Sequence, residues 1–236
     1  MNQASPSEDL QQTIDKLWTG SYHGVLSTQS VKFEGYPFGS LLPICRDGQG
    51  NPLMMISHLA QHTRNLDSNP RCSLTLIEQN HADVLQWTRL TCLADAQPAT
   101  ASNAMERYCR YYPDGRRYHK ELNFSLYRLL PRQFYLIAGF GSARWFDVTR
   151  VLDMPRFQTA AEMEILYQLN AREHDLLNRF LSSRGVSGQG AAHAVGANPR
   201  GFDIRQGETL TRYNLPNPIN NEINFIAELE RAIENG

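Results

Sequence analysis

The amino-acid sequence predicts a mainly β domain followed by a smaller α+β domain. About six or seven short apolar runs, separated by turn residues, occupy residues 21–141, with few helical segments between them. Such a series favours a closed antiparallel barrel over a parallel βαβ sheet. The pattern changes near DMPRFQTA at residues 153–160, after which helices flank three short strands. We therefore expect a barrel domain at 1–150 and an α+β domain at 155–236.

In the first domain, a helix is expected at residues 5–20. Ser5 can cap its start, Glu8 stands where a capping box needs an acidic residue, and Gly20 ends it. A second helix is expected at 99–112. The strands are bounded by turn residues such as DGQGN and are expected at 23–30, 38–46, 52–57, 71–79, 84–97, 123–131 and 132–141.

The second domain begins with an apolar pattern of helical period that predicts one long helix at 159–183. Turn residues at Asn198-Pro199 and at Gly207 then separate three short strands. An amphipathic helix is expected at 221–234. The strands are expected at 191–197, 201–206 and 208–216.

Composition excludes several classes of function. The 236 residues carry a net charge of −1, so no overall field attracts nucleic acid or an anionic membrane, and the basic, aromatic stretch at 110–120 is expected to be a solvated loop. The start of the sequence does not resemble a signal peptide, and no apolar run is long enough to span a bilayer. The 4 cysteines form no CxxC pair, which favours reduced, buried thiols. We expect a cytoplasmic protein with neither a nucleic-acid nor a membrane partner.

The segment MMISHLAQHTRNLDSNPRCSLTLIE, Met54 to Glu78, reads as a strand, a helix from about 57 to 68, and a strand. His58 and His62 stand at i, i+4, as in some zinc sites, but HLAQH lacks an interior glutamate and no third ligand is evident. No metal site is therefore expected. A helix that starts directly after a strand can instead bind a phosphate through its free N–H groups.

Side chains in this segment suit the phosphate interpretation. Ser57 and Thr63 add hydroxyl donors, and Arg64 adds a planar guanidinium. The alternative is that Ser57 only caps the helix, Arg64 is solvated, and Asn65 caps a turn. Residue types alone leave the two interpretations open.

Other candidates are weaker. His174 lies on the apolar face of the long predicted helix, where a core histidine paired with Asn170 is expected rather than a ligand. His193 has still less support. The glycine-rich stretches GFGSAR and GQGAAHAVG fit turns, since neither is a GxGxxG between strand and helix. No serine-nucleophile motif is present, and no catalytic residue is identified.

Four stretches in order carry a family resemblance: PFGSLLPI, ISHLAQHTRNLDSNPRCSLTLIE, RLTCLADA and NFSLYRLLPRQFYLIAGFGSA. Together, over roughly Ser21 to Trp145, they resemble the pyridoxamine-5′-phosphate-oxidase-like split-barrel proteins, and among them the haem-utilisation branch called HugZ/HutZ. Further along, LNAREH and GANPRGFDI resemble the small C-terminal domain often joined to this barrel. The resemblance implies a six-stranded split β-barrel that forms a homodimer.

Flavin-binding members hold FMN at the dimer interface. The resemblance would give phosphate-binding roles to Ser57, Thr63, Arg64 and Asn65, with His62 nearby, in a flavin-dependent oxidoreductase. Haem-binding members instead degrade haem or carry it for iron acquisition, with a histidine as iron ligand. A third possibility is a non-catalytic scaffold or regulatory binding protein.

Three departures from the haem pattern favour FMN over haem. Asn123 stands where the haem-degrading relatives carry an aspartate that assists the ligand, and an amide accepts less strongly than a carboxylate. The tail bearing the proximal histidine has no match, so only His174 or His193 could replace that ligand. Thr63 adds a phosphate donor where the haem relatives can have alanine.

Overall fold

The computed structural model describes residues 6–139, 142–153, 155–171, 176–186, 190–215, 218–219 and 223–234. The chain divides into two compact units, Met1–Met154 and Pro155–Gly236. Each unit has its own apolar core, and each is described below by itself.

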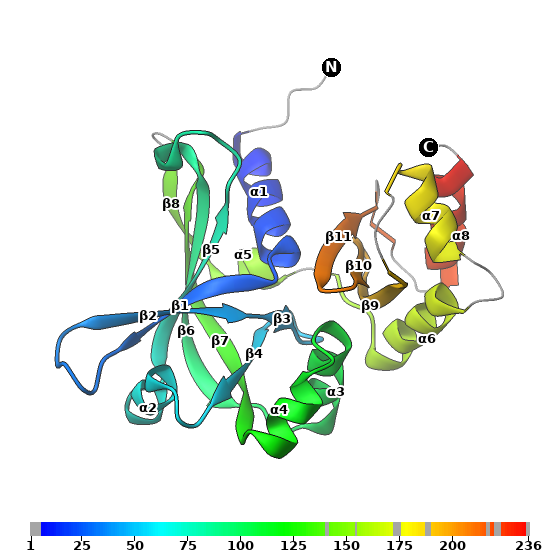
Figure 1. The fold of residues 1–236 in the computed structure, drawn as a ribbon. Helices are drawn as coiled ribbons and strands as arrows, with labels where there is room; N and C mark the ends of the chain where they lie inside the picture. The colour runs from blue at the N-terminus through cyan, green and yellow to red at the C-terminus, as the bar shows by residue number, and fades with distance from the viewer. Residues whose placement is uncertain are drawn as a thin grey trace. The chain divides into compact units, whose positions relative to one another are not determined.

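The first unit is built on one curled, antiparallel sheet (Figure 1). Its strands follow the order β2-β1-β5-β6-β7-β4-β3, and β8 pairs with β7 outside this path. The strands are β1 His23–Gln29, β2 Pro37–Pro43, β3 Cys45–Arg46, β4 Pro52–Ser57, β5 Arg71–Glu78, β6 Thr88–Pro98, β7 Phe124–Ile137 and β8 Ala143–Asp147. The predicted split-barrel class is confirmed, although the sheet has 8 strands rather than the six of the resemblance.

Alternation along the strands gives the sheet one inner and one outer face. In β6 the side chains of Leu90 and Cys92 are fully buried, while their neighbours are partly exposed. The helix α1 covers the inner face, where Trp18 packs edge-on against Phe134 with ring centroids 4.9 Å apart. The helical segments of this unit are α1 Pro6–Gly20, α2 Gln61–Ser68, η1 Val84–Gln86, α3 Ser102–Tyr111, α4 Gly115–Glu121 and α5 Val148–Leu152.

Several predicted elements differ in detail. The strand expected at 38–46 is divided at Ile44 into β2 and β3, and the Ile44 N–H donates to the carbonyl of Tyr22, one pair beyond His23 and Pro43. The strands expected at 123–131 and 132–141 are one strand, β7, with a register shift opposite Leu93 and Ala94. The loop expected at 110–120 is wrong in part, because it contains the helix α4. Neither β8 nor α5 was expected.

The second unit is a three-stranded antiparallel meander with helices on one face, as the sequence predicted. The long helix expected at 159–183 is wrong: α6 ends at Asn170, and α7 begins at Leu176. Residues 172–175, which include His174, lie outside the described residues. The elements of this unit are α6 Thr159–Asn170, α7 Leu176–Ser183, β9 Ala192–Asn198, β10 Gly201–Gln206, β11 Thr209–Asn214 and α8 Ile223–Glu234.

The helix α6 is bound along the edge of β9 by two side chains. Asn170 donates from Nδ2 to the carbonyl of Ala194 (2.9 Å) and accepts from its N–H (2.8 Å). Glu162 accepts through Oε1 from the N–H of Ala197 at 3.0 Å. These bonds give the helix a non-local reason to end at Asn170, whose side chain pairs with β9. The expected partner of Asn170, His174, lies outside the described residues.

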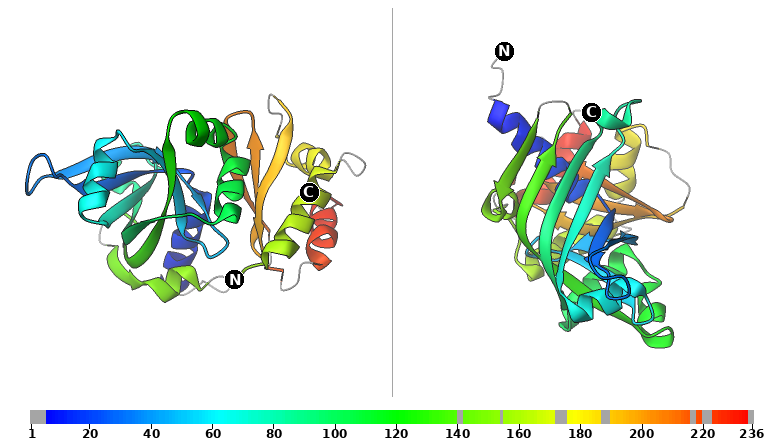
Figure 2. Two further views of the ribbon diagram at one scale, coloured as in Figure 1. Left: turned by 90° about the horizontal axis from the view of Figure 1, so that it is seen from below. Right: turned by 90° about the vertical axis from the view of Figure 1, so that its left-hand side faces the viewer.

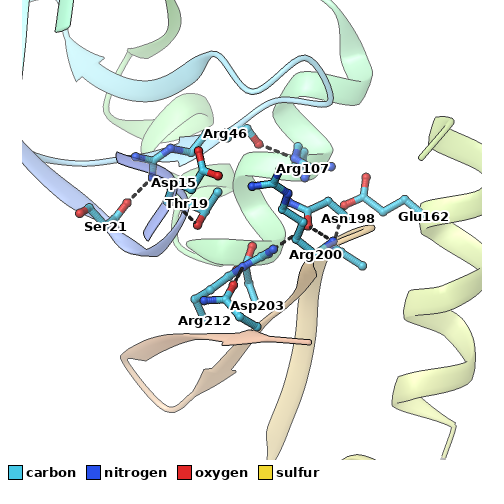
Figure 3. Close-up of polar contacts among 12 residues, drawn as sticks. Asp15, Thr19, Ser21, Arg46, Arg107, Glu162, Asn198, Arg200, Asp203 and Arg212 are labelled. Carbon is cyan, nitrogen blue, oxygen red and sulfur yellow. Dashed lines mark hydrogen bonds and ion pairs between the residues drawn. The ribbon is translucent and has the colours of Figure 1, made fainter. Parts of the chain in front are cut away.

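An arginine ties together the strands of the meander (Figure 3). The Arg212 guanidinium donates through Nη1 to Asp203 (3.1 Å) and through Nη2 to Asn198 (2.6 Å). Both members of the ion pair are nearly buried. Gly201, at the start of β10, leaves no room for a side chain: a Cβ there would lie 2.0 Å from the Tyr213 carbonyl oxygen.

All four cysteines are free, which confirms the expectation of unpaired thiols. Burial raises the pKa of Cys72 to about 12 and also raises that of Cys92, so neither is a reactive thiolate near neutral pH. In the described part of the chain, no helix is long and apolar enough to cross a membrane.

Candidate functional site

The predicted binding segment lies at the junction of β4, α2 and the β1–β2 hairpin, with α2 below β2 in Figure 1. Ser57 is the last residue of β4, and the helix begins at Gln61, four positions later than expected. The Ser57 carbonyl accepts from the N–H of Ala60 at 3.1 Å, which forms a turn before the helix. Ala60 then occupies the N-cap, where no side chain caps the first turn.

Asn65 is fully buried and anchors the helix to the hairpin. Its Oδ1 accepts from the N–H of Val31 (3.1 Å) and from Gln61 Nε2 (2.9 Å). Its Nδ2 donates to the hydroxyl of Thr28 at 2.9 Å. The amide therefore holds α2, β1 and the hairpin loop together, and no part of it faces solvent.

Thr63 is also engaged within the protein. Its hydroxyl donates to the Ser57 carbonyl at 2.6 Å, and the side chain is only 4% exposed. This bond ties the first turn of α2 back to the end of β4. Of the four predicted phosphate donors, Thr63 and Asn65 thus have internal partners.

Ser57 and Arg64 remain able to reach an anion. The Ser57 hydroxyl accepts from the N–H of Leu59 at 3.2 Å, which leaves its own hydrogen free to donate. Arg64 is exposed and has no polar partner among the described residues. The uncapped first turn of α2 lies in the same segment and offers backbone N–H groups.

His62 points inward from α2. Its Nδ1 lies 3.1 Å from the Ser40 hydroxyl on β2, and its Nε2 is buried with no hydrogen-bond partner in the described structure. Burial lowers the pKa of His62 from the ordinary value of 6.5, so the ring is neutral at physiological pH.

His58 and His119 form a second, exposed group at the start of β7. The Nδ1 of His58 lies 3.1 Å from the carbonyl oxygen of Asn123, and the Nδ1 of His119 lies 2.8 Å from that of Phe124. Asn123 has φ 53°, the only positive φ of a described residue other than glycine. The group that accepts from His58 is therefore the backbone carbonyl of Asn123, not the side-chain amide to which the family resemblance pointed.

Sequence reasoning missed the partners of these residues. Thr28, Ser40 and Asn123 lie between 22 and 65 positions away from the side chains that they bind. No local motif marks such a contact. The described residues contain no group of three or more metal-ligating side chains, and no structural feature identifies a general acid or base.

We predict that Asn65→Ala lowers the free energy of unfolding by about 3 kcal/mol, because it removes a fully buried amide and takes one hydrogen-bond partner from the buried Thr28 hydroxyl and one from the Val31 N–H. Urea unfolding measures the change. Asn69→Ala is the matched control: its side chain accepts one exposed hydrogen bond, from the N–H of Arg71, and its loss should cost no more than about 1 kcal/mol. Equal effects of the two changes would contradict an anchoring role for Asn65.

We predict a pH dependence of stability that originates at His62. Because its pKa is lowered in the folded protein, the unfolded chain binds a proton near pH 6.5 before the folded chain does. The contribution of His62 is therefore complete above pH 6.5 and declines as the pH falls below it. Urea unfolding at a series of pH values should show a steeper acid-side loss for the wild type than for His62→Gln. Parallel curves would argue against a buried, neutral ring.

Comparison with known proteins agrees with this fold. The model of the CREG beta-barrel family matches residues 16–150, more than half of the chain. A crystal structure of Atu2129, a protein of unknown function from Agrobacterium tumefaciens, superposes with a TM-score of 0.75. That match covers 100% of this chain and 98% of the other, at 20% sequence identity, which supports the fold alone.

Two relatives match the barrel in sequence. The haem oxygenase HutZ of Vibrio cholerae is 29% identical over 126 residues, which are 50% of this chain and 71% of HutZ. The chloroplastic non-canonical haem oxygenase HOZ of Arabidopsis thaliana is 43% identical over 72 residues, 30% of this chain but only 21% of HOZ. The chain is thus similar in its barrel to haem oxygenases of the HugZ/HutZ kind, and it belongs to the CREG beta-barrel family.

Proposed function

We propose that this protein binds haem and serves haem utilisation, the alternative that the sequence had placed second to FMN. Two relatives that match the barrel are both named haem oxygenases. The observation that carries the proposal is the engagement of Thr63 and Asn65 in internal hydrogen bonds. A phosphate would find only two of the four side chains that the FMN interpretation assigned to it.

The exposed histidine and leucine side chains near the start of β7 are of the kinds that haem binding requires. Haem needs a nitrogen ligand for its iron, apolar contact for the macrocycle and cations for its propionates. Imidazoles are exposed at His58 and His119, and the side chains of Leu59 and Leu122 are 67% and 47% exposed in the adjoining sequence. Arg64 supplies an exposed cation nearby in the chain. Bound haem would supply a redox-active iron, and the chain's own residues would ligate and orient it.

The test is a pair of titrations with the purified full-length chain. Haemin should give a Soret band shifted from that of free haemin, which saturates at a fixed stoichiometry. FMN is the second candidate, favoured by exposed Arg64 and the uncapped start of α2. If FMN binds there, its absorbance band should be perturbed, and Arg64→Ala should weaken that effect. A flavin complex without any haemin complex would overturn the haem proposal, and binding of neither would favour the scaffold interpretation.

We also propose that the protein is a homodimer that pairs through the outer face of the barrel sheet. Residues directly opposite one another in an antiparallel sheet point to the same face. One such row crosses six strands and carries no charge: Leu41, Val25, Thr75, Thr91, Tyr135 and Trp145. Its two ends are large and exposed, Leu41 at 69% and Trp145 at 56%. Exposed apolar groups arranged across a sheet are typical of a protein interface.

We predict that light scattering after gel filtration gives twice the mass of the chain, and that Leu41→Glu or Trp145→Glu halves it, because each places a charge on the proposed interface. Tyr167→Glu is the control, since Tyr167 is 73% exposed on α6 in the other unit. A monomeric wild type, or dimers that persist in both barrel variants, would exclude this face as the interface.

A further inference from the structure

We infer that His58 would supply the nitrogen ligand of the haem iron, an assignment that rests on the proposed haem binding. The sequence had offered only His174 and His193 for this role. In the sequence, His58 and His62 form an i, i+4 pair that did not predict a metal site. The structure separates these two histidines and gives His58 the features of an iron ligand.

The first feature is a fixed tautomer. A carbonyl oxygen can only accept a hydrogen bond, so the Nδ1 of His58, 3.1 Å from the Asn123 oxygen, must carry the hydrogen. In the neutral ring this leaves the lone pair on Nε2. Metal-binding histidines characteristically donate their other N–H to a carbonyl or carboxylate, which orients the ring and raises the basicity of the ligating nitrogen.

The second feature is a rigid support for that carbonyl. Ser57 on β4 pairs directly with Phe124 on β7, so His58 and Asn123 extend from two strands held in register. Asn123, directly before β7, adopts φ 53°, a conformation that asparagine tolerates better than most residues. The imidazole is thus oriented before any ligand arrives, which lowers the entropic cost of binding.

The third feature is access. The side chain of His58 is exposed, and its neighbour Leu59 presents 67% of its surface to solvent. Leu122 directly precedes Asn123, whose carbonyl oxygen bonds His58. The Nε2 of His62, by contrast, is buried, so iron could not reach it without displacing α2 from β2. His62 is therefore excluded as the ligand.

His119 is the closest competitor, because its Nδ1 donates to the carbonyl of Phe124 in the same manner. It lies on α4 between charged residues, with Arg116 one turn earlier and Lys120 next to it. The macrocycle of haem needs apolar contact around its ligand. Leu59, which is 67% exposed, adjoins His58, whereas Tyr118 and the charged Lys120 flank His119; Leu122, the C-cap residue of α4, does not distinguish the two. His119 thus provides a control of matched exposure and hydrogen bonding.

The experiment is a haemin titration of the full chain and its variants, followed by the Soret band and by electron paramagnetic resonance. His58→Ala should lose the imidazole-ligated spectrum and bind haemin at least about tenfold more weakly. Added imidazole should restore the wild-type spectrum in this variant, as a merely structural role would not. His119→Ala should keep the wild-type spectrum.

Asn123→Gly provides the positive control for the supporting carbonyl. Glycine keeps the backbone oxygen and adopts a positive φ readily, so the spectrum should be unchanged if the acceptor is the backbone. An unaltered spectrum in His58→Ala, or its loss in His119→Ala, His174→Ala or His193→Ala instead, would overturn the assignment while leaving haem binding intact. A wild-type chain that gives no Soret shift would contradict the proposed function itself.

Discussion

The buried amide of Asn65 is the constraint on which the candidate site depends. Two of its hydrogen bonds join the helix α2 to Thr28 of β1 and to Val31 in the loop of the β1–β2 hairpin, and a third, from Gln61, lies within the helix. The side chain itself is fully buried. Because Asn65 faces the hairpin, the helical period fixes the directions of its neighbours on α2: His62 points toward β2, and Arg64 points to solvent. The orientation of His62 and Arg64 therefore follows from the hydrogen bonds of the buried Asn65.

The polar groups of the segment accordingly fall into two sets. In the first set, the polar groups of Thr63 and Asn65 bind the end of β4 and the β1–β2 hairpin. In the second set, the side chains of Ser57, His58 and Arg64 are partly or fully exposed. A phosphate site built from all the side chains of the FMN interpretation would require Thr63 and Asn65 to be free as well. An iron porphyrin requires far fewer polar contacts, and this difference favours haem over FMN.

Much of the fold could be predicted because its signals are local. Turn residues such as those at 47–51 and alternation in β5 or β6 are read within a few positions of the chain. The errors arise where a distant contact decides the outcome. The helix α2 starts late because the Ser57 carbonyl is engaged by a turn and by Thr63. The contact of His58 with Asn123 joins residues 65 positions apart, which no motif could reveal.

The way in which α6 covers β9 has a consequence for the behaviour of the second unit in concentrated solution. An edge strand with free N–H and C=O groups can recruit a strand from another molecule, a common route to aggregation. Asn170 occupies both groups of Ala194, and Glu162 occupies the N–H of Ala197. A foreign strand would have to displace two side chains of a packed helix before it could add to β9. This edge is thereby protected against intermolecular β-polymerisation by side chains of a packed helix, and not by charged or proline residues within the edge strand itself.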